Sequence, residues 1–127
     1  MSYLENLFSL SDKSVFLTGA SSGIGERWAE TVCKAGCKRL ALCARRTDRL
    51  KVLADELCQK YPNAKVCVVT LDVNEDETKI KLAFDEAEKR FEPHATFDVI
   101  INNAGVGPNS PVLQATQETF NSTYVFV

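Results

Sequence analysis

The segment from Thr18 to Gly25 constrains the possible fold more than any other part of this sequence. It reads Thr-Gly-Ala-Ser-Ser-Gly-Ile-Gly, and it lies between an apolar run at residues 14–17 and an amphipathic stretch that begins at Ile24. Glycines at 19, 23 and 25 would allow a sharp turn, the approach of a phosphate and close packing of a helix on a strand. The free N–H groups at the start of that helix would face the phosphate. The segment therefore predicts a strand, a phosphate-binding turn and a helix.

The spacing of these glycines leaves an alternative open. It is G-x-x-x-G-x-G, which differs from the common dinucleotide-binding pattern G-x-G-x-x-G. On its own, the segment could also be an ordinary glycine and serine turn between a strand and a helix. The choice between the two interpretations depends on the motifs that follow in the chain.

Composition predicts one soluble globular domain spanning residues 1–127. The chain is 45% hydrophobic and 25% charged, with a formal net charge of −2 and with acidic and basic residues interspersed. This charge pattern shows no basic cluster of the kind that binds nucleic acid or an anionic membrane. No apolar run approaches the roughly 20 residues that span a bilayer, and the first 12 residues lack the features of a signal peptide. We therefore expect a cytoplasmic protein that binds neither nucleic acid nor membrane.

The cysteines predict reduced and mostly buried thiols. There are five, an odd number, with no C-x-x-C pair, at positions 33, 37, 43, 58 and 67. Cys33 and Cys37 are four residues apart and could in principle bind a metal, but His94 is the only histidine. We expect no metal site.

Strands and helices alternate along the chain. Apolar runs predict strands at residues 14–18, 40–44, 66–71 and 98–101. The second run is continuous rather than alternating, which suits a parallel strand that is buried on both faces. Strands that alternate with helices across short links favour right-handed β-α-β crossovers. The sequence therefore predicts an α/β fold with a doubly wound parallel sheet.

Three helices are expected between these strands. The first begins at Ile24, ends at Gly36 and has its apolar stripe at Ile24, Trp28, Val32 and Ala35. The second is capped by Thr47 or Asp48, ends before Pro62 and has its stripe at Leu50, Leu53 and Leu57. The third begins at Asn74 or Asp76, and its stripe is Ile80, Phe84, Ala87 and Phe91.

The pattern is weaker after the fourth strand. Residues 107–111 are expected to form a loop, a fifth helix is suggested from Thr116, and residues 123–127 have the composition of a strand. An apolar terminus such as residues 125–127 would need to be buried by other chain. We therefore expect a sheet cut after its fourth strand and the start of the next helix, with an apolar end that is buried by chain this sequence does not contain.

Three ordered motifs resemble the short-chain dehydrogenase/reductase family. They are the T-G-x-x-x-G-x-G loop at residues 18–25, Leu71-Asp72-Val73 after the third strand, and Asn-Asn-Ala-Gly at residues 102–105. The resemblance covers essentially the whole chain but only the N-terminal half of the family's domain. It implies a Rossmann-like fold and a dinucleotide-binding function.

The resemblance also implies roles for individual residues. Amides around Ser21, Ser22 and Ile24 would hold the pyrophosphate, with the glycines at 19, 23 and 25 shaping the loop. The Asp72 carboxylate would accept from the adenine amino group, and the Val73 amide would donate to the ring. Asn103 would line the ribose and nicotinamide end, while Asn102 would brace the sheet. The alternative for Asp72, Asn102 and Asn103 is a role as hydrogen-bonding turn residues.

Arg45 and Arg46 point to the choice of cofactor. They follow the second strand about 20 residues after the glycine loop, where an acidic residue would hold the 2′-hydroxyl of NAD. A guanidinium instead offers a forked, charge-assisted contact to a 2′-phosphate, so NADP is favoured. The alternative is that both arginines are merely solvated at a helix start.

We expect no catalytic residue in this chain. The resemblance implies a Tyr that donates a proton to the carbonyl, a Lys four residues later and a Ser that orients the substrate, all beyond the fourth strand. After Gly105 the chain has Tyr124 but no lysine, and Ser110 and Ser122 lie too early to match. Tyr61 and Lys65 fit Y-x-x-x-K, but Pro62 prevents the helix that the motif needs.

Two hypotheses about function follow. One is that the chain belongs to an NADP(H)-dependent oxidoreductase that interconverts a small carbonyl compound and a secondary alcohol, with a homo-oligomer as the complete form. The other is a catalytically inactive nucleotide-binding or interaction module. The exposed apolar end favours the first hypothesis.

Overall fold

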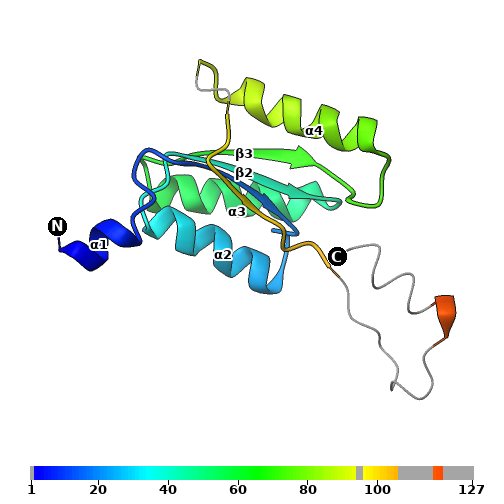
Figure 1. Ribbon diagram of the computed structural model, residues 1–127, viewed down its shortest axis with the longest axis horizontal. Coiled ribbons are helices and arrows are strands. Elements are labelled where there is room, and N and C mark those ends of the chain that lie inside the picture. The colour runs from blue at the N-terminus through cyan, green and yellow to red at the C-terminus, as the bar shows by residue number, and fades with distance from the viewer. Residues whose placement is uncertain (1, 94–95, 106–115, 119–127) are drawn as a thin grey trace.

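The computed structural model describes residues 2–93, 96–105 and 116–118. A parallel four-stranded sheet lies at its centre (Figure 1). Its strands are β1 (Ser14–Thr18), β2 (Arg39–Ala44), β3 (Lys65–Thr70) and β4 (Val99–Ile101), in the order β3-β2-β1-β4. This order confirms the predicted doubly wound sheet, and the strand positions agree with the expected ones to within one residue at each end.

The register brings the carboxyl ends of the strands to one edge of the sheet. Leu17 of β1 pairs with Leu42 of β2 on one side and with Ile101 of β4 on the other. Ala44 of β2 pairs with Thr70 of β3. β2 follows β1 on one side of it in the sheet, whereas β4 lies on its other side. The strand order therefore reverses between β1 and β4, and ligands of such sheets bind at this topological switch point.

Helices cover both faces of the sheet. Figure 1 shows α2 (Gly23–Lys34) and α3 (Thr47–Lys60) on one face and α4 (Glu77–Arg90) on the other. The first face is filled by a cluster that includes Leu17, Leu42 and Leu50, all fully buried. On the second face Phe16 packs against Phe84 and Phe97, with ring centroids 4.9 and 5.3 Å apart. Both faces of β1 and β2 are therefore buried, which explains their continuous apolar runs.

The expected apolar stripe of α2 is wrong in part. Ile24 and Trp28 are 71% and 43% exposed, and the buried residues of α2 are Gly25, Ala29, Val32 and Cys33. In its first two turns the helix buries Gly25 and Ala29, and a Cβ on Gly25 would already overlap the Gly19 carbonyl oxygen. Only Val32 of the expected stripe is buried, while Ala35 caps the helix and is half-buried.

The start of α3 also differs from the expectation. Its N-cap residue is Arg46, which makes no side-chain capping hydrogen bond, so Thr47 and Asp48 lie within the first turn instead of capping it. Its predicted core residues Leu50, Leu53 and Leu57 are all buried, and the helix ends at Lys60, before Pro62.

The prediction for α4 holds at its start. Asp76 is the N-cap residue, and its Oδ1 accepts a hydrogen bond from Lys79 N at 3.0 Å. Ala87 and Phe91 are buried, while Ile80 and Phe84 are half-buried against the same cluster. A short helix that the sequence pattern did not predict, α1 (Tyr3–Leu7), precedes the sheet.

Several expectations lie outside the described residues. These are the loop at 107–111 and the strand at 123–127, whereas Gln117 and Glu118, within the suggested fifth helix, are helical. In the part of the chain that the structure describes, no helix is both long and apolar enough to cross a bilayer.

Candidate functional site

A cavity of about 370 Å³ opens at the carboxyl ends of the strands. Its lining includes Thr18 at the end of β1, Ala44 at the end of β2, Leu71 after β3 and Asn103 after β4. It thus lies at the switch point of the sheet, where β-α loops from several strands converge. Every predicted cofactor-binding residue lines this cavity except Gly23 and Gly25; those that do are Gly19, Ser21, Ser22, Ile24, Arg45, Arg46, Asp72, Val73 and Asn103.

The three glycines of the loop have three different physical roles. Gly19 has φ +67°, and a Cβ there would lie 2.7 Å from the Ala104 Cα atom. Gly23 has φ +59° but open space around it. A Cβ on Gly25 would lie 2.0 Å from the Gly19 carbonyl oxygen. Gly25 therefore allows α2 to approach the loop, while Gly23 allows the turn and leaves the space beside it empty.

Thr18 ties the glycine loop to the segment after β4. Its Oγ1 accepts hydrogen bonds from Asn103 N and Ala104 N, both at 3.1 Å, and donates to Ile101 O at 3.4 Å. The side chain is buried. Sequence reasoning did not include Thr18 among the site residues, although its place as the first residue of the glycine motif was a usable signal.

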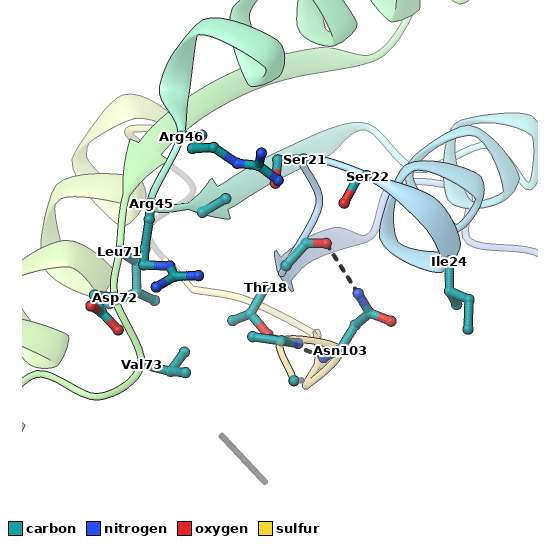
Figure 2. A pocket seen from close by; sticks show the side chains of 14 residues that line it. Thr18, Ser21, Ser22, Ile24, Arg45, Arg46, Leu71, Asp72, Val73 and Asn103 are labelled. Atoms are coloured by element: carbon teal, nitrogen blue, oxygen red, sulfur yellow. Dashed lines mark hydrogen bonds between the residues drawn. The ribbon is translucent and has the colours of Figure 1, made fainter. Parts of the chain in front are cut away.

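Asn103, rather than Asn102, braces the site. The Asn103 Nδ2 atom donates to Gly19 O at 3.1 Å, and this bond joins the two loops across the cavity (Figure 2). Asn102 is exposed. The expectation that Asn102 braces the sheet stays a prediction.

The start of α2 offers backbone donors to the cavity. Ser22 is its N-cap residue, with φ −166° and ψ 164°, and its side chain makes no capping hydrogen bond within the described chain. Ser21 and Ser22 both line the cavity. The first N–H groups of α2, together with its positive dipole end, can therefore be offered to an anion.

The two arginines lie beside this anion-binding end. Arg45 and Arg46 connect β2 to α3, and both are exposed. Figure 2 shows their side chains extending from the end of β2 toward the glycine loop. Two guanidinium groups at the rim of one cavity favour a ligand that carries a phosphate group.

Asp72 and Val73 form the wall opposite the glycine loop. Asp72 Oδ1 accepts from Asn74 N at 2.9 Å, and Asp72 O accepts from Glu75 N at 3.0 Å. These bonds fix the turn that follows β3 and hold the carboxylate at the cavity wall. The carboxylate can still accept a further hydrogen bond, since each of its oxygens has two lone pairs.

The excluded Tyr61 and Lys65 motif lies away from the cavity. Tyr61 is the C-cap residue of α3, and Lys65 is the first residue of β3. The amino end of β3 is at the edge of the sheet opposite the cavity. The two side chains also do not share a helix, so they cannot act as a pair on one helical face.

The cysteines offer no reactive thiolate at the cavity. Cys33, Cys37 and Cys43 are buried, Cys67 is half-buried and Cys58 is exposed. Burial raises the pKa of the Cys43 thiol, and it raises the pKa of Cys67 to about 11. Among the described residues no group of three or more His, Cys, Asp or Glu side chains could hold a metal ion.

Comparison with known proteins places this site in a family. The short chain dehydrogenase family model matches residues 13–126. An uncharacterized oxidoreductase of Mycobacterium tuberculosis is 42% identical over 101 residues, which are 80% of this chain and 38% of that protein.

Solved structures agree with this match. A short-chain type dehydrogenase/reductase from Mycobacterium marinum superposes with a TM-score of 0.80 at 29% identity, over 95% of this chain and 45% of that one. An alcohol dehydrogenase from the archaeon Thermococcus sibiricus, complexed with 5-hydroxy-NADP, gives a TM-score of 0.73 at 32% identity, over 91% of this chain and 47% of that one.

The chain spans less than half the length of each of these relatives. The matched part contains the parallel sheet, the glycine loop and the Asn-Asn-Ala-Gly segment that together enclose the cavity. The chain belongs to the short-chain dehydrogenase/reductase family.

Proposed function

We propose that this chain binds NADP(H) and forms the cofactor-binding part of an oxidoreductase that interconverts a carbonyl compound and a secondary alcohol by hydride transfer. One observation carries the proposal: the glycine loop, the arginine pair and the Asp72 turn, which come from three different β-α connections, line a single cavity at the switch point. The complex of the Thermococcus sibiricus alcohol dehydrogenase, 32% identical, with 5-hydroxy-NADP supports the choice of cofactor.

Each part of the cavity has a role in this proposal. Amides of the loop around Ser21 and Ser22 hold the pyrophosphate, and the guanidinium groups of Arg45 and Arg46 hold the 2′-phosphate. Asp72 accepts from the adenine amino group, and the Val73 amide donates to the ring. Asn103 lines the ribose and nicotinamide end while its amide keeps the loop in place.

The wider assignment goes beyond this chain. We propose that residues 1–127 form one dinucleotide-binding unit, the N-terminal half of a longer oxidoreductase domain, and that the complete protein is a cytoplasmic homo-oligomer acting on a small molecule. The length of the relatives supports this assignment, since the chain matches 38% to 47% of theirs.

Titration of the purified chain with NADPH and NADH tests the cofactor assignment. We expect NADPH to bind more tightly than NADH in isothermal titration calorimetry at fixed ionic strength. The substitutions Arg45→Ala and Arg46→Ala should each weaken NADPH binding roughly tenfold and leave NADH binding nearly unchanged, since each removes a charge-assisted contact to phosphate.

Arg49→Ala is the matched control, because Arg49 is an exposed arginine of α3 that does not line the cavity. It should leave both affinities unchanged. Tighter binding of NADH than of NADPH by the unmodified chain would contradict the cofactor assignment.

A further inference from the structure

A second cavity adjoins the proposed cofactor cavity. It has a volume of about 340 Å³ and is lined by Arg45, Thr70, Leu71, Asp72, Glu75 and Lys79. Arg45, Leu71 and Asp72 line both cavities. The Arg45 side chain, to which we assign the 2′-phosphate, thus borders a space whose far wall is the first turn of α4 and the residues before it.

The charged groups of this second cavity are balanced. Arg45 and Lys79 supply two positive charges, and Asp72 and Glu75 supply two negative charges. Lys79 Nζ lies 2.6 Å from Glu75 Oε2, and both side chains are partly exposed. Asp72 is held by the turn that follows β3, through its bond from Asn74 N. Lys79 therefore offsets the charge of the Glu75 carboxylate directly.

We propose that the Lys79–Glu75 ion pair determines how strongly the site prefers a 2′-phosphate over a 2′-hydroxyl. Lys79 is a positioning residue: it holds the Glu75 carboxylate and cancels its charge beside Arg45. This inference rests on the proposed function, because it concerns the selectivity of the same site.

The physical reason is the difference in charge between the two cofactors. A 2′-phosphate carries up to two negative charges near neutral pH, whereas a 2′-hydroxyl carries none. Screening is incomplete within about 8 Å at physiological ionic strength, so an unbalanced carboxylate at the cavity wall would repel the phosphate. With Lys79 in place, the pair acts at a distance as a nearly neutral group. Loss of Lys79 would leave the second cavity with a net charge of −1.

The ion pair suits this test because it contributes little to folding. It joins Lys79 in the first turn of α4 to Glu75, which precedes the helix, and exposed ion pairs of this kind contribute little to stability. The variants Lys79→Met and Glu75→Gln should therefore fold as the unmodified chain does, which circular dichroism checks. Lys81→Met is the matched control, since Lys81 forms a 2.7 Å pair with Asp85 on the same helix and lines neither cavity.

The experiment compares 2′,5′-ADP with 5′-AMP, two probes that differ only in the 2′-phosphate. Calorimetry on the 127-residue chain gives the ratio of the two affinities for each variant. Lys79→Met should lower this ratio by about three- to fivefold, as expected for one exposed charge, and Glu75→Gln, which leaves the second cavity with a net charge of +1, should raise it. The double variant Lys79→Met/Glu75→Gln should return the ratio to that of the unmodified chain, and Lys81→Met should not change it.

Two outcomes would overturn the inference while leaving the proposed function intact. One is an unchanged ratio in Lys79→Met when the unmodified chain prefers 2′,5′-ADP. The other is a double variant whose affinity ratio is as low as that of Lys79→Met, which would mean that Lys79 acts by direct contact with the phosphate. An unmodified chain without preference for 2′,5′-ADP would overturn both the proposed function and this inference.

Discussion

At the residue scale, the cavity is built by side chains that are absent or very small. A Cβ on Gly25 would overlap the Gly19 carbonyl and approach Asn103 Nδ2 to 2.7 Å, so α2 can pack against the loop only if residue 25 is glycine. Ala29, one turn later, is fully buried on the same helix face. The position of the N-terminal part of α2, and with it the donors at its start, therefore depends on Gly25 and Ala29 contributing almost no side-chain volume to this face.

The first prediction concerns Gly25. Gly25→Ala should lower the free energy of unfolding by about 1–3 kcal/mol or more, because the new methyl group would lie 2.0 Å from backbone that cannot move without disturbing the loop. Urea denaturation measures the loss. Gly105→Ala is the control, since no described atom lies within 4 Å of its Cβ position; equal losses in both variants would contradict the packing argument.

The second prediction concerns Thr18. Thr18→Val keeps the shape of the side chain but removes the acceptor for Asn103 N and Ala104 N. We expect a loss of about 1–3 kcal/mol in urea denaturation, since two partly buried N–H groups lose their partner, together with weaker binding of NADPH.

Thr31→Val serves as the comparison for Thr18. The Thr31 Oγ1 atom donates to Arg27 O at 2.8 Å on the exposed side of α2, so this bond lies within one helix and joins no two segments. Its replacement should change stability by no more than about 0.5 kcal/mol. A Thr18→Val variant as stable as Thr31→Val would show that the Thr18 bonds do not hold the two loops together.

At the element scale, helix starts are fixed by different means in different parts of the fold. Asp76 caps α4 with its own side chain, whereas α2 and α3 begin without any side-chain capping hydrogen bond. These two uncapped starts follow β1 and β2, whose loops line the cavity. Their backbone donors are therefore available to a ligand, while α4 has its cap satisfied within the protein.

The third prediction follows from this contrast. Asp76→Ala should destabilise the chain by about 1 kcal/mol, because it removes the acceptor for Lys79 N at the start of α4. Asp48→Ala, in the first turn of α3, removes no capping bond and should cost only a few tenths of a kcal/mol through the helix dipole. Equilibrium urea denaturation distinguishes the two, and the reverse order of losses would contradict the assignment of caps.

At the scale of the whole molecule, the sheet order gathers residues that are far apart in the chain. Thr18 ends β1, and Arg45, Asp72 and Asn103 follow β2, β3 and β4, so the parallel strands bring all four to one edge. Each connection contributes only a few side chains, so the cavity exists only in the folded sheet.

The fourth prediction is that this 127-residue chain by itself does not reduce carbonyl compounds. It contains no Tyr-x-x-x-Lys pair after Asn103, and its one match, at Tyr61 and Lys65, lies at the opposite edge of the sheet from the cavity. Incubation of the purified chain with NADPH and a panel of ketones and aldehydes should show no loss of absorbance at the nicotinamide band. Turnover above the rate without protein would contradict this prediction.

The sequence by itself determined the strands, the sheet class and the candidate site. Continuous apolar runs predicted every strand of the described chain, and apolar residues at a period of 3.6 predicted each helix that covers the sheet. Burial on both faces of a strand, or on one face of a helix, is visible in the order of apolar residues along the sequence. The motifs at residues 18–25, 71–73 and 102–105 could also be found in the sequence, since each consists of consecutive residues that form a single turn.

Only the tertiary structure decided which side chains within these segments pack against the sheet and which join the loops. In the first two turns of α2 the buried residues are Gly25 and Ala29 rather than Ile24 and Trp28, because close packing on the sheet outweighs hydrophobicity there. In the same way, Thr18 and Asn103 form the bridge between the loops, and this bridge depends on how β1 and β4 pair across 85 residues of sequence separation. Contacts over that separation are set by the register of the sheet. The local sequence pattern of either segment does not specify this register.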